Sequence, residues 1–225
     1  MRILYRIFWL PFYRLWALRH IRQTQVYRHG SIQVLVPPGV FHPGLFFSTP
    51  IFLDFLKSID FQGKNVLDMG AGSGMLGLFV NRLGAIVTAT DINPVAVGAT
   101  RRNAEANGVV LETFTTIQSD LFDALPPKLF DVILINPPYY PRRPQHDVEY
   151  AFFAGENLEY FEKLFRQMPA YINQHTNIWM ILSEDCDYQA IQAAAKPYGF
   201  ELFKVFERKK WGERLFVVHV RPRAI

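Results

Sequence analysis

The stretch that most constrains this chain covers residues 65–77 and reads Asn-Val-Leu-Asp-Met-Gly-Ala-Gly-Ser-Gly-Met-Leu-Gly. The short apolar run is followed by an acid and then by alternating glycines. This pattern predicts a buried parallel strand, a tight turn and a helix from Met75. Glycine lets the backbone adopt positive φ and pass close to a ligand, and the helix start leaves N–H groups facing the same crevice. The density of glycines exceeds what a simple turn needs, so we expect a ligand-binding loop.

Two kinds of cofactor fit such a loop. Gly72, Gly74 and Gly77 match the dinucleotide pattern G-x-G-x-x-G, with Asp91 further on to hold a ribose. In that frame the first glycine should follow the strand directly, whereas four residues intervene and Asp68 would repel a pyrophosphate. The other frame, D-x-G-x-G-x-G from Asp68 to Gly74, resembles the S-adenosylmethionine loop of class I methyltransferases. There the loop approaches a cofactor that carries a sulfonium and an ammonium, so the resemblance implies that a nearby carboxylate is favourable.

Size and composition indicate one domain with a short extension. Half of the 225 residues are apolar, enough for one good core. The single cysteine, Cys186, excludes an intramolecular disulfide and suits a reducing compartment, so we expect a cytoplasmic protein. Near the N-terminus, Arg14 interrupts the apolar run and no small-residue cleavage site follows, which argues against a signal peptide and a membrane span.

Positive charge is concentrated at the N-terminus. Residues 1–53 contain six arginines and no acid, whereas the remainder has 18 basic and 20 acidic residues. Affinity for nucleic acid or anionic lipid would therefore come mainly from the extension. In residues 1–22 the arginines interleave with Trp, Phe and Leu, and three roles stay open: docking onto the catalytic domain, peripheral membrane contact, or an arm that binds RNA or a protein substrate. We expect residues 1–43 to form this basic aromatic arm with a short hairpin, and residues 44–225 to form the catalytic domain.

Strand and helix patterns alternate along the rest of the chain. This order predicts an α/β, Rossmann-like fold with a mostly parallel seven-stranded sheet and helices on both faces. The last two strands have a short connection, so they must pair as an antiparallel hairpin. The expected strands are 25–27, 32–36, 66–68, 85–90, 109–117, 130–135, 177–182, 201–206 and 214–220; the expected helices begin at Thr49 or cover 75–81, 93–107, 157–172 and 188–196.

Polar residues follow four different predicted strands at their carboxyl ends: Asp68, Asp91, Asp120 and Asn136. Open α/β sheets bind ligands at that edge, so we expect these residues to form one site. Asp91 lies 23 residues after Asp68, one strand–helix–strand step, and its carboxylate can accept hydrogen bonds from both ribose hydroxyls. Charge-assisted hydrogen bonds of this kind contribute about 1.5–3 kcal/mol each. Ile92 would pack on the adenine.

Resemblance to the methyltransferases extends the expected cofactor site. Asp120, followed by Leu121, resembles that family's adenine-contacting acid, and the segment equivalent to the apolar loop 37–49 closes over the cofactor. His42 in this loop is expected to be a hydrogen-bonded loop residue rather than a base. No metal is expected. The cofactor set is Thr49, Asp68, Gly70, Gly72, Gly74, Asp91, Ile92, Asp120, Leu121 and Asn136.

The motif Asn136-Pro137-Pro138-Tyr139 resembles the N-P-P-Y of methyltransferases that modify planar nitrogens. Such a nitrogen donates two hydrogens and has a delocalised lone pair, so it is a poor nucleophile. The Asn136 carboxamide oxygen and the Pro137 carbonyl can accept those hydrogens and direct the lone pair towards the methyl group. The prolines stiffen this arrangement and Tyr139 can stack on a flat substrate, so positioning and electrostatic complementarity carry the catalysis.

The layout from residue 34 to 221 is similar to that of the release-factor glutamine methyltransferases, the HemK/PrmC-like family. Residues 151–157 and 212–214 also resemble segments of that family, whereas none of these 225 residues is expected to form the helical substrate-recognition domain of its bacterial members. The resemblance implies a protein substrate methylated on a glutamine amide. An RNA or DNA exocyclic-amine methyltransferase is the main alternative, with nucleic acid as partner. A non-catalytic cofactor-binding protein and a nicotinamide oxidoreductase fit the motifs less well.

Overall fold

The computed structural model describes residues 23–45, 47–138, 140–145, 149, 151–210 and 212–223. The predictions made for the arm 1–22 and for Tyr139 lie outside these residues. Within the described residues, no helix combines the length and apolarity that crossing a bilayer requires.

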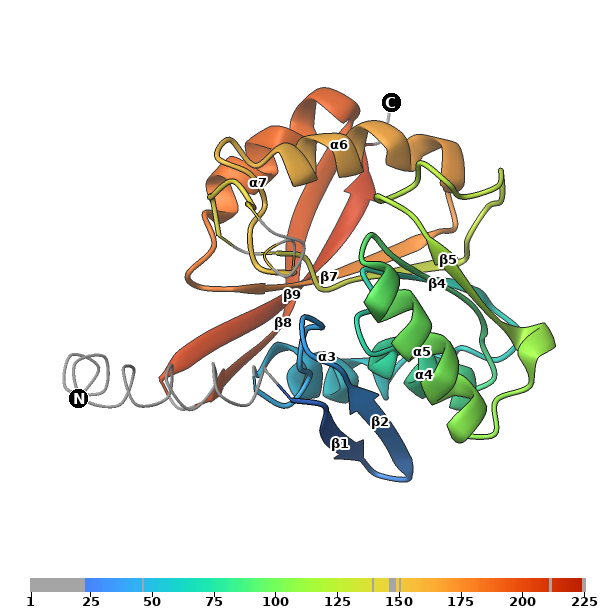
Figure 1. Ribbon diagram of the computed structural model, residues 1–225. Helices are drawn as coiled ribbons and strands as arrows, with labels where there is room; N and C mark the ends of the chain where they lie inside the picture. The colour runs from blue at the N-terminus through green and yellow to red at the C-terminus, as the bar shows by residue number, and fades with distance from the viewer. Residues whose placement is uncertain are drawn as a thin grey trace, which may run out of the picture.

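A seven-stranded sheet in the order β5-β4-β3-β6-β7-β9-β8 forms the centre of the molecule (Figure 1). Neighbouring strands from β5 to β7 are parallel, and β9 pairs antiparallel with both β7 and β8. The predicted parallel sheet with an antiparallel C-terminal hairpin is therefore confirmed. The strands are β3 (Asn65–Met69), β4 (Ile86–Asp91), β5 (Phe114–Gln118), β6 (Val132–Ile135), β7 (Asn177–Ser183), β8 (Phe200–Lys210) and β9 (Glu213–Pro222).

Helices cover both faces of this sheet (Figure 1). Because side chains alternate along a strand, Val66 and Leu134 join one apolar cluster while Leu67 and Ile133 join the other. The first cluster packs under α3 (Ser48–Leu56), α4 (Met75–Arg82) and α5 (Pro94–Ala106). The second packs under α6 (Glu159–Gln167) and α7 (Tyr188–Ala195).

The strand order places a binding crevice at the middle of the sheet. After β3 the chain adds β4 and β5 on one side, then returns to place β6 on the other side of β3. Connections leaving β3 and β6 therefore diverge, which opens a crevice beyond the carboxyl ends of these strands. The glycine loop follows β3 and Asn136 follows β6, so both meet this crevice.

Several element boundaries differ from the sequence prediction, and the largest differences lie at β5 and α6. The predicted strand 109–117 is wrong in its first half: Val110 and Leu111 are exposed, a 3₁₀ turn covers Leu111–Thr113, and β5 starts at Phe114. The predicted helix 157–172 starts later and ends at Gln167, where a 3₁₀ turn over Met168–Tyr171 begins. Pro169 explains the second difference, because proline cannot donate the backbone hydrogen bond that would continue an α-helix.

A small antiparallel hairpin, β1 (Gln25–His29) and β2 (Ile32–Val36), packs on the first apolar cluster. The Asn103 side chain of α5 joins this hairpin to the glycine loop after β3. Its Oδ1 accepts from the Leu35 N–H at 2.9 Å, and its Nδ2 donates to the carbonyls of Leu35 and Ser73, both at 2.9 Å. One buried amide thus joins the hairpin, α5 and the glycine loop.

We expect Asn103→Ala to lower the free energy of unfolding by about 2 kcal/mol, because the buried Ser73 carbonyl and the part-buried Leu35 backbone groups would lose their hydrogen-bond partner. Urea unfolding measures this difference. The matched control is Arg102→Ala, at an exposed position of the same helix, which should change stability by less than about 0.5 kcal/mol. Equal stability of the two variants would contradict the bridging role of Asn103.

Candidate active site

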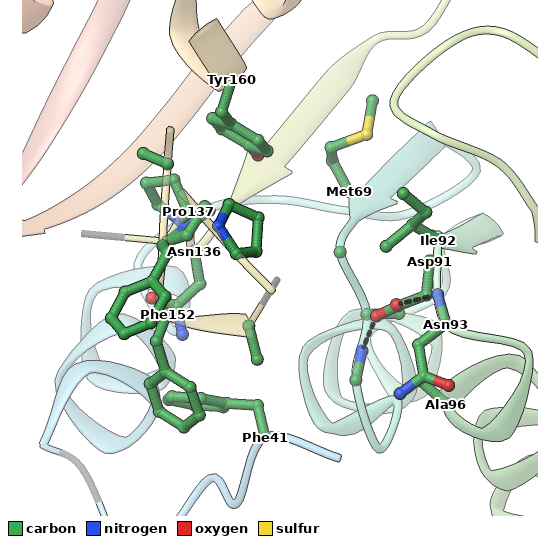
Figure 2. A pocket seen from close by; sticks show the side chains of 18 of the residues that line it. Phe41, Met69, Asp91, Ile92, Asn93, Ala96, Asn136, Pro137, Phe152 and Tyr160 are labelled. Carbon is green, nitrogen blue, oxygen red and sulfur yellow. Dashed lines mark hydrogen bonds between the residues drawn. The ribbon is translucent and has the colours of Figure 1, made fainter. Parts of the chain in front are cut away.

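A cavity of about 660 Å³ lies at the carboxyl edge of the sheet. Figure 2 shows its two walls: Met69, Asp91 and Ile92 face Asn136 and Phe152 across the open space. Its volume falls in the range of about 300–1,000 Å³ that is usual for ligand sites. Of the residues selected from the sequence, these line the cavity: Thr49, Gly70, Gly72, Asp91, Ile92, Asp120, Leu121, Asn136, Pro137 and Pro138.

The glycine loop forms the floor of the cavity, next to the wall that contains Asp91. Gly70, Gly72 and Gly74 have φ values of 73°, 59° and 83°, a region that favours glycine. A Cβ on Gly70 would meet no atom within 4 Å, so its backbone is open to a ligand. Gly74 does not line the cavity: a Cβ there would lie 2.8 Å from the Thr100 side chain. Gly74 therefore allows α5 to pack closely against the loop.

The Asp91 carboxylate is held by two backbone donors. Oδ2 accepts from the Gly72 N–H and Oδ1 from the Asn93 N–H, each at 2.9 Å. Burial raises the pKa of this carboxyl group, while these two hydrogen bonds act in the opposite direction. Each carboxylate oxygen has a further lone pair, so the group can also accept from hydroxyls of a ligand in the cavity.

Asp68 lies beneath the loop rather than in the cavity wall. Its side chain is fully buried, Oδ2 accepts from the Gly77 N–H at 2.8 Å, and Oδ1 has no hydrogen-bond partner among the described residues. Burial raises the pKa of Asp68 to about 7, against the opposing effect of the Gly77 bond, and the nearby Asp91 raises it further. Asp68 therefore does not line the cavity, although the sequence had suggested that it would. Its side chain instead makes an internal contact between β3 and α4.

The second wall is built around Asn136. Its Nδ2 donates to Ser48 Oγ at 3.3 Å, a contact between residues 88 positions apart. Ser48 is fully buried at the start of α3, so this contact ties the Asn136 carboxamide to that helix. Pro137 and Pro138 are buried directly after it. The sequence places Ser48 beside Thr49 in the segment expected to close over the site, but it gives no signal for the contact with Asn136.

Sequence reasoning also missed several cavity residues: Phe41, Phe152, Tyr160, Ser183 and Glu213. Phe41 and Phe152 contact each other with ring centroids 6.1 Å apart, and Ser183 Oγ donates to Glu213 Oε1 at 3.2 Å. Phe41 lies in the apolar loop 37–49, and Phe152 and Glu213 lie in the two segments that resemble the methyltransferase family, so those signals could have identified them.

Two further predictions concern His42 and metal ligation. His42 Nδ1 accepts from the Gly44 and Leu45 N–H groups at 3.0 and 3.2 Å, as predicted for a loop residue. The part of the chain that the structure describes contains no group of three or more His, Cys, Asp or Glu side chains that could hold a metal ion.

Asp68 should make stability depend on pH. A carboxyl with a folded pKa of about 7 and an unfolded pKa near 3.9 binds more protons when folded, so stability falls as pH rises between about 4 and 7. We expect Asp68→Asn, which keeps an acceptor for Gly77, to remove this contribution. Urea unfolding at pH 5 and pH 8 measures it: the wild type should lose more stability than the variant, and equal losses would contradict a protonated Asp68.

Two proteins with names are similar to this chain in sequence. Over 185 residues the chain is 29% identical to a Methanocaldococcus jannaschii protein that bears the provisional name protein N5-glutamine methyltransferase, covering 79% of this chain and 92% of that protein. It is 32% identical over 171 residues to ribosomal RNA small subunit methyltransferase C of Chromohalobacter salexigens, covering 69% of this chain but only 49% of that relative.

Solved structures show the same fold. A T. thermophilus 16S rRNA N2 G1207 methyltransferase, in complex with AdoMet and guanosine, matches 90% of this chain and 50% of its own with a TM-score of 0.63 and 21% identity. An E. cuniculi complex responsible for methylating the termination factor eRF1 matches 83% of this chain and 99% of its own with a TM-score of 0.62 and 18% identity.

The sequence model of the methyltransferase small domain matches residues 31–208, most of the chain. The seven-stranded sheet and the cavity at its switch point agree with this match. The chain therefore belongs to the methyltransferase small domain family and is an S-adenosylmethionine-dependent methyltransferase.

Proposed function

We propose that this enzyme transfers a methyl group from S-adenosylmethionine to a planar NH2 nitrogen, with the side-chain amide of a protein glutamine as the first candidate. The observation that carries the proposal is the position of Asn136. It follows β6 directly and lines the same cavity as the glycine loop and Asp91. A donor on one wall and an acceptor on the other would therefore meet inside one cavity (Figure 2).

The first wall fits the parts of the donor. Asp91 can accept from the ribose hydroxyls, and the open backbone at Gly70 leaves room for the methionine portion. Met69 and Ile92 offer apolar surface to the adenine ring, and Asp120 offers an acceptor to its amine. When bound, S-adenosylmethionine supplies a methyl group made electrophilic by its sulfonium.

The second wall fits a planar NH2 group. Such a group needs two hydrogen-bond acceptors close together, and the Asn136 carboxamide oxygen and the Pro137 carbonyl provide them. The nitrogen end of the Asn136 side chain contacts the Ser48 hydroxyl, and its oxygen end lies on the other side of the carboxamide. Two prolines in succession hold this backbone in extended conformations. Holding the acceptor in a reactive geometry can lower a barrier by about 7–11 kcal/mol, so no covalent intermediate is required.

Glutamine is the first candidate because the M. jannaschii relative covers most of both chains and is named for glutamine methylation. The matched chain of the eRF1-methylating complex is of similar extent, which agrees with this choice. The exocyclic amine of a nucleic-acid base is the second candidate. The ribosomal RNA relative favours it, as do Phe41 and Phe152, whose rings could stack on a flat base inside the cavity.

Asp91→Ala should weaken binding of the donor by a factor of about 100 or more in Kd, because two charge-assisted hydrogen bonds of about 1.5–3 kcal/mol each are lost. Isothermal titration calorimetry with S-adenosylhomocysteine measures this factor. Asp54→Ala removes an exposed carboxylate outside the cavity and should leave Kd unchanged. Undiminished binding by the Asp91 variant would remove this residue from the donor site.

Asn136→Ala should keep the Kd for S-adenosylhomocysteine within about threefold but lower the rate of methyl transfer by about 100-fold or more, the usual effect of removing one transition-state hydrogen bond. The rate is measured as radiolabel transferred from S-adenosylmethionine into a cell extract. Asn173→Ala, an exposed position outside the cavity, is the matched control. Full transfer by the Asn136 variant would exclude the positioning mechanism.

The same labelled extract identifies the acceptor class. If the acceptor is a protein glutamine, protease digestion should convert the label into small fragments while nuclease digestion leaves it intact. Release by nuclease alone would instead support a base amine.

A further inference from the structure

The loop that carries Asp120 is held in a strained conformation. Leu121 has a φ of 55°, and Leu158 is the only other non-glycine residue with positive φ among those the structure describes. A left-handed conformation at such a residue costs about 1–3 kcal/mol and persists only where the surroundings enforce it. Leu121 is buried and, like Asp120, lines the cavity. The contacts that enforce this conformation therefore also set the shape of the wall.

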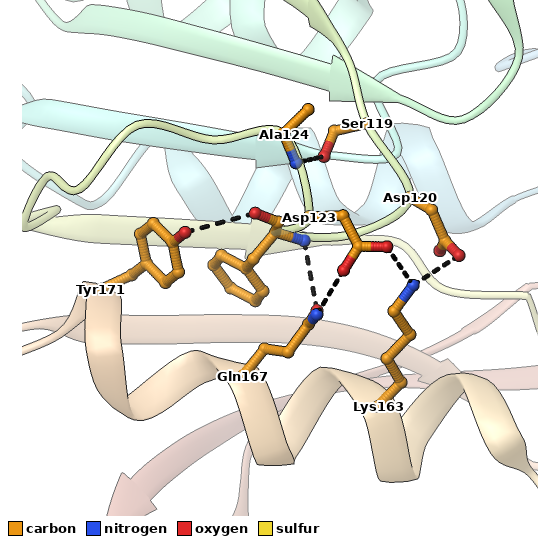
Figure 3. A network of polar contacts seen from close by, with 8 residues as sticks. Ser119, Asp120, Asp123, Ala124, Lys163, Gln167 and Tyr171 are labelled. Carbon is orange, nitrogen blue, oxygen red and sulfur yellow. Dashed lines mark hydrogen bonds and ion pairs between the residues drawn. The ribbon is translucent and has the colours of Figure 1, made fainter.

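Those contacts come from α6 and the turn that follows it (Figure 3). Gln167 Oε1 accepts from the Phe122 N–H at 3.4 Å, and its Nε2 donates to Asp123 Oδ1 at 2.5 Å. The Tyr171 hydroxyl lies 3.2 Å from the Phe122 carbonyl oxygen and 3.1 Å from that of Leu125. Lys163 and Gln167 are spaced four apart, so they lie on one side of α6. Tyr171, in the 3₁₀ turn after α6, contacts the same loop.

Lys163 is the member of this row that reaches the cavity. Its Nζ lies 2.5 Å from Asp120 Oδ2 and 2.6 Å from Asp123 Oδ2, and its side chain is 24% exposed. Asp120 itself is 48% exposed, and ion pairs that are open to solvent contribute only about 0–1 kcal/mol to stability. The contact matters more for where it holds the Asp120 carboxylate than for the stability of the fold.

We propose that Lys163 is a positioning residue for the methyl donor: by binding Oδ2 of Asp120, it fixes that carboxylate on the cavity wall so that Oδ1 accepts the amine of the adenine. This proposal rests on the proposed function, because it assumes S-adenosylmethionine as the ligand. Without Lys163, Asp120 can rotate and the loop loses one of its ties to α6. Loss of Lys163 should then weaken binding of the adenine base and leave the rate of the chemical step unchanged.

The test is calorimetric binding of two probes, S-adenosylhomocysteine and adenosine, to the full chain. We expect Lys163→Met to weaken both by about tenfold, equivalent to about 1.4 kcal/mol, since the two probes share the base. Lys163→Arg, which keeps the charge and the donors, should bind within about threefold of the wild type. In radiolabel transfer, the KM for the donor should rise in Lys163→Met while kcat at saturating donor stays unchanged.

Arg166→Met is the matched control, because Arg166 lies exposed on the same helix outside the cavity. It removes the same charge and should leave both Kd values unchanged. Equal weakening in both variants would show a long-range charge effect and overturn the proposal, as would wild-type affinity in Lys163→Met. Lys163→Gln gives the same comparison if the Met variant has a lowered melting temperature. A wild type that binds neither probe would instead reject the proposed function, and this inference with it.

Discussion

The site depends on the hydrogen bond from the Gly72 N–H to the Asp91 carboxylate. This 2.9 Å contact joins the loop after β3 to the end of β4, and so fixes the floor of the cavity against one of its walls. It requires a backbone that can turn towards the next strand, which the positive φ of Gly70 and Gly72 provides. The Thr100 hydroxyl donates to the Gly72 carbonyl from α5 and holds the same loop from below. A loop this rigid can meet a ligand with little further ordering.

Much of this arrangement could be predicted because parallel strands end at a common edge. The apolar run at Val66 and Leu67 and the glycines after it specify a strand and a turn through local chemistry alone. Asp91 and Asn136 could be assigned to the same site because each follows a strand of the same sheet. Periodicity and strand ends thus locate the main-chain framework of a site.

What could not be predicted are the contacts between distant segments. Ser48 reaches Asn136 across 88 residues, and Lys163 reaches Asp120 across 43. No local pattern distinguishes Lys163 from an ordinary solvated helix residue, because its role follows from how α6 packs on the loop. Asp68 shows the converse: its motif position suggests a ligand, whereas packing turns its side chain towards Gly77. Side-chain direction is decided by tertiary packing, which sequence spacing does not contain.

The central claim is that Asn136 holds an NH2 group next to an activated methyl donor. A crystal structure with S-adenosylhomocysteine bound tests it most directly. The donor sulfur should lie about 6–7 Å from the Asn136 carboxamide oxygen, roughly one hydrogen bond plus one near-attack contact, with that oxygen facing the sulfur across the cavity. A sulfur bound outside this cavity, or an Asn136 side chain turned away from it into the core, would contradict the claim.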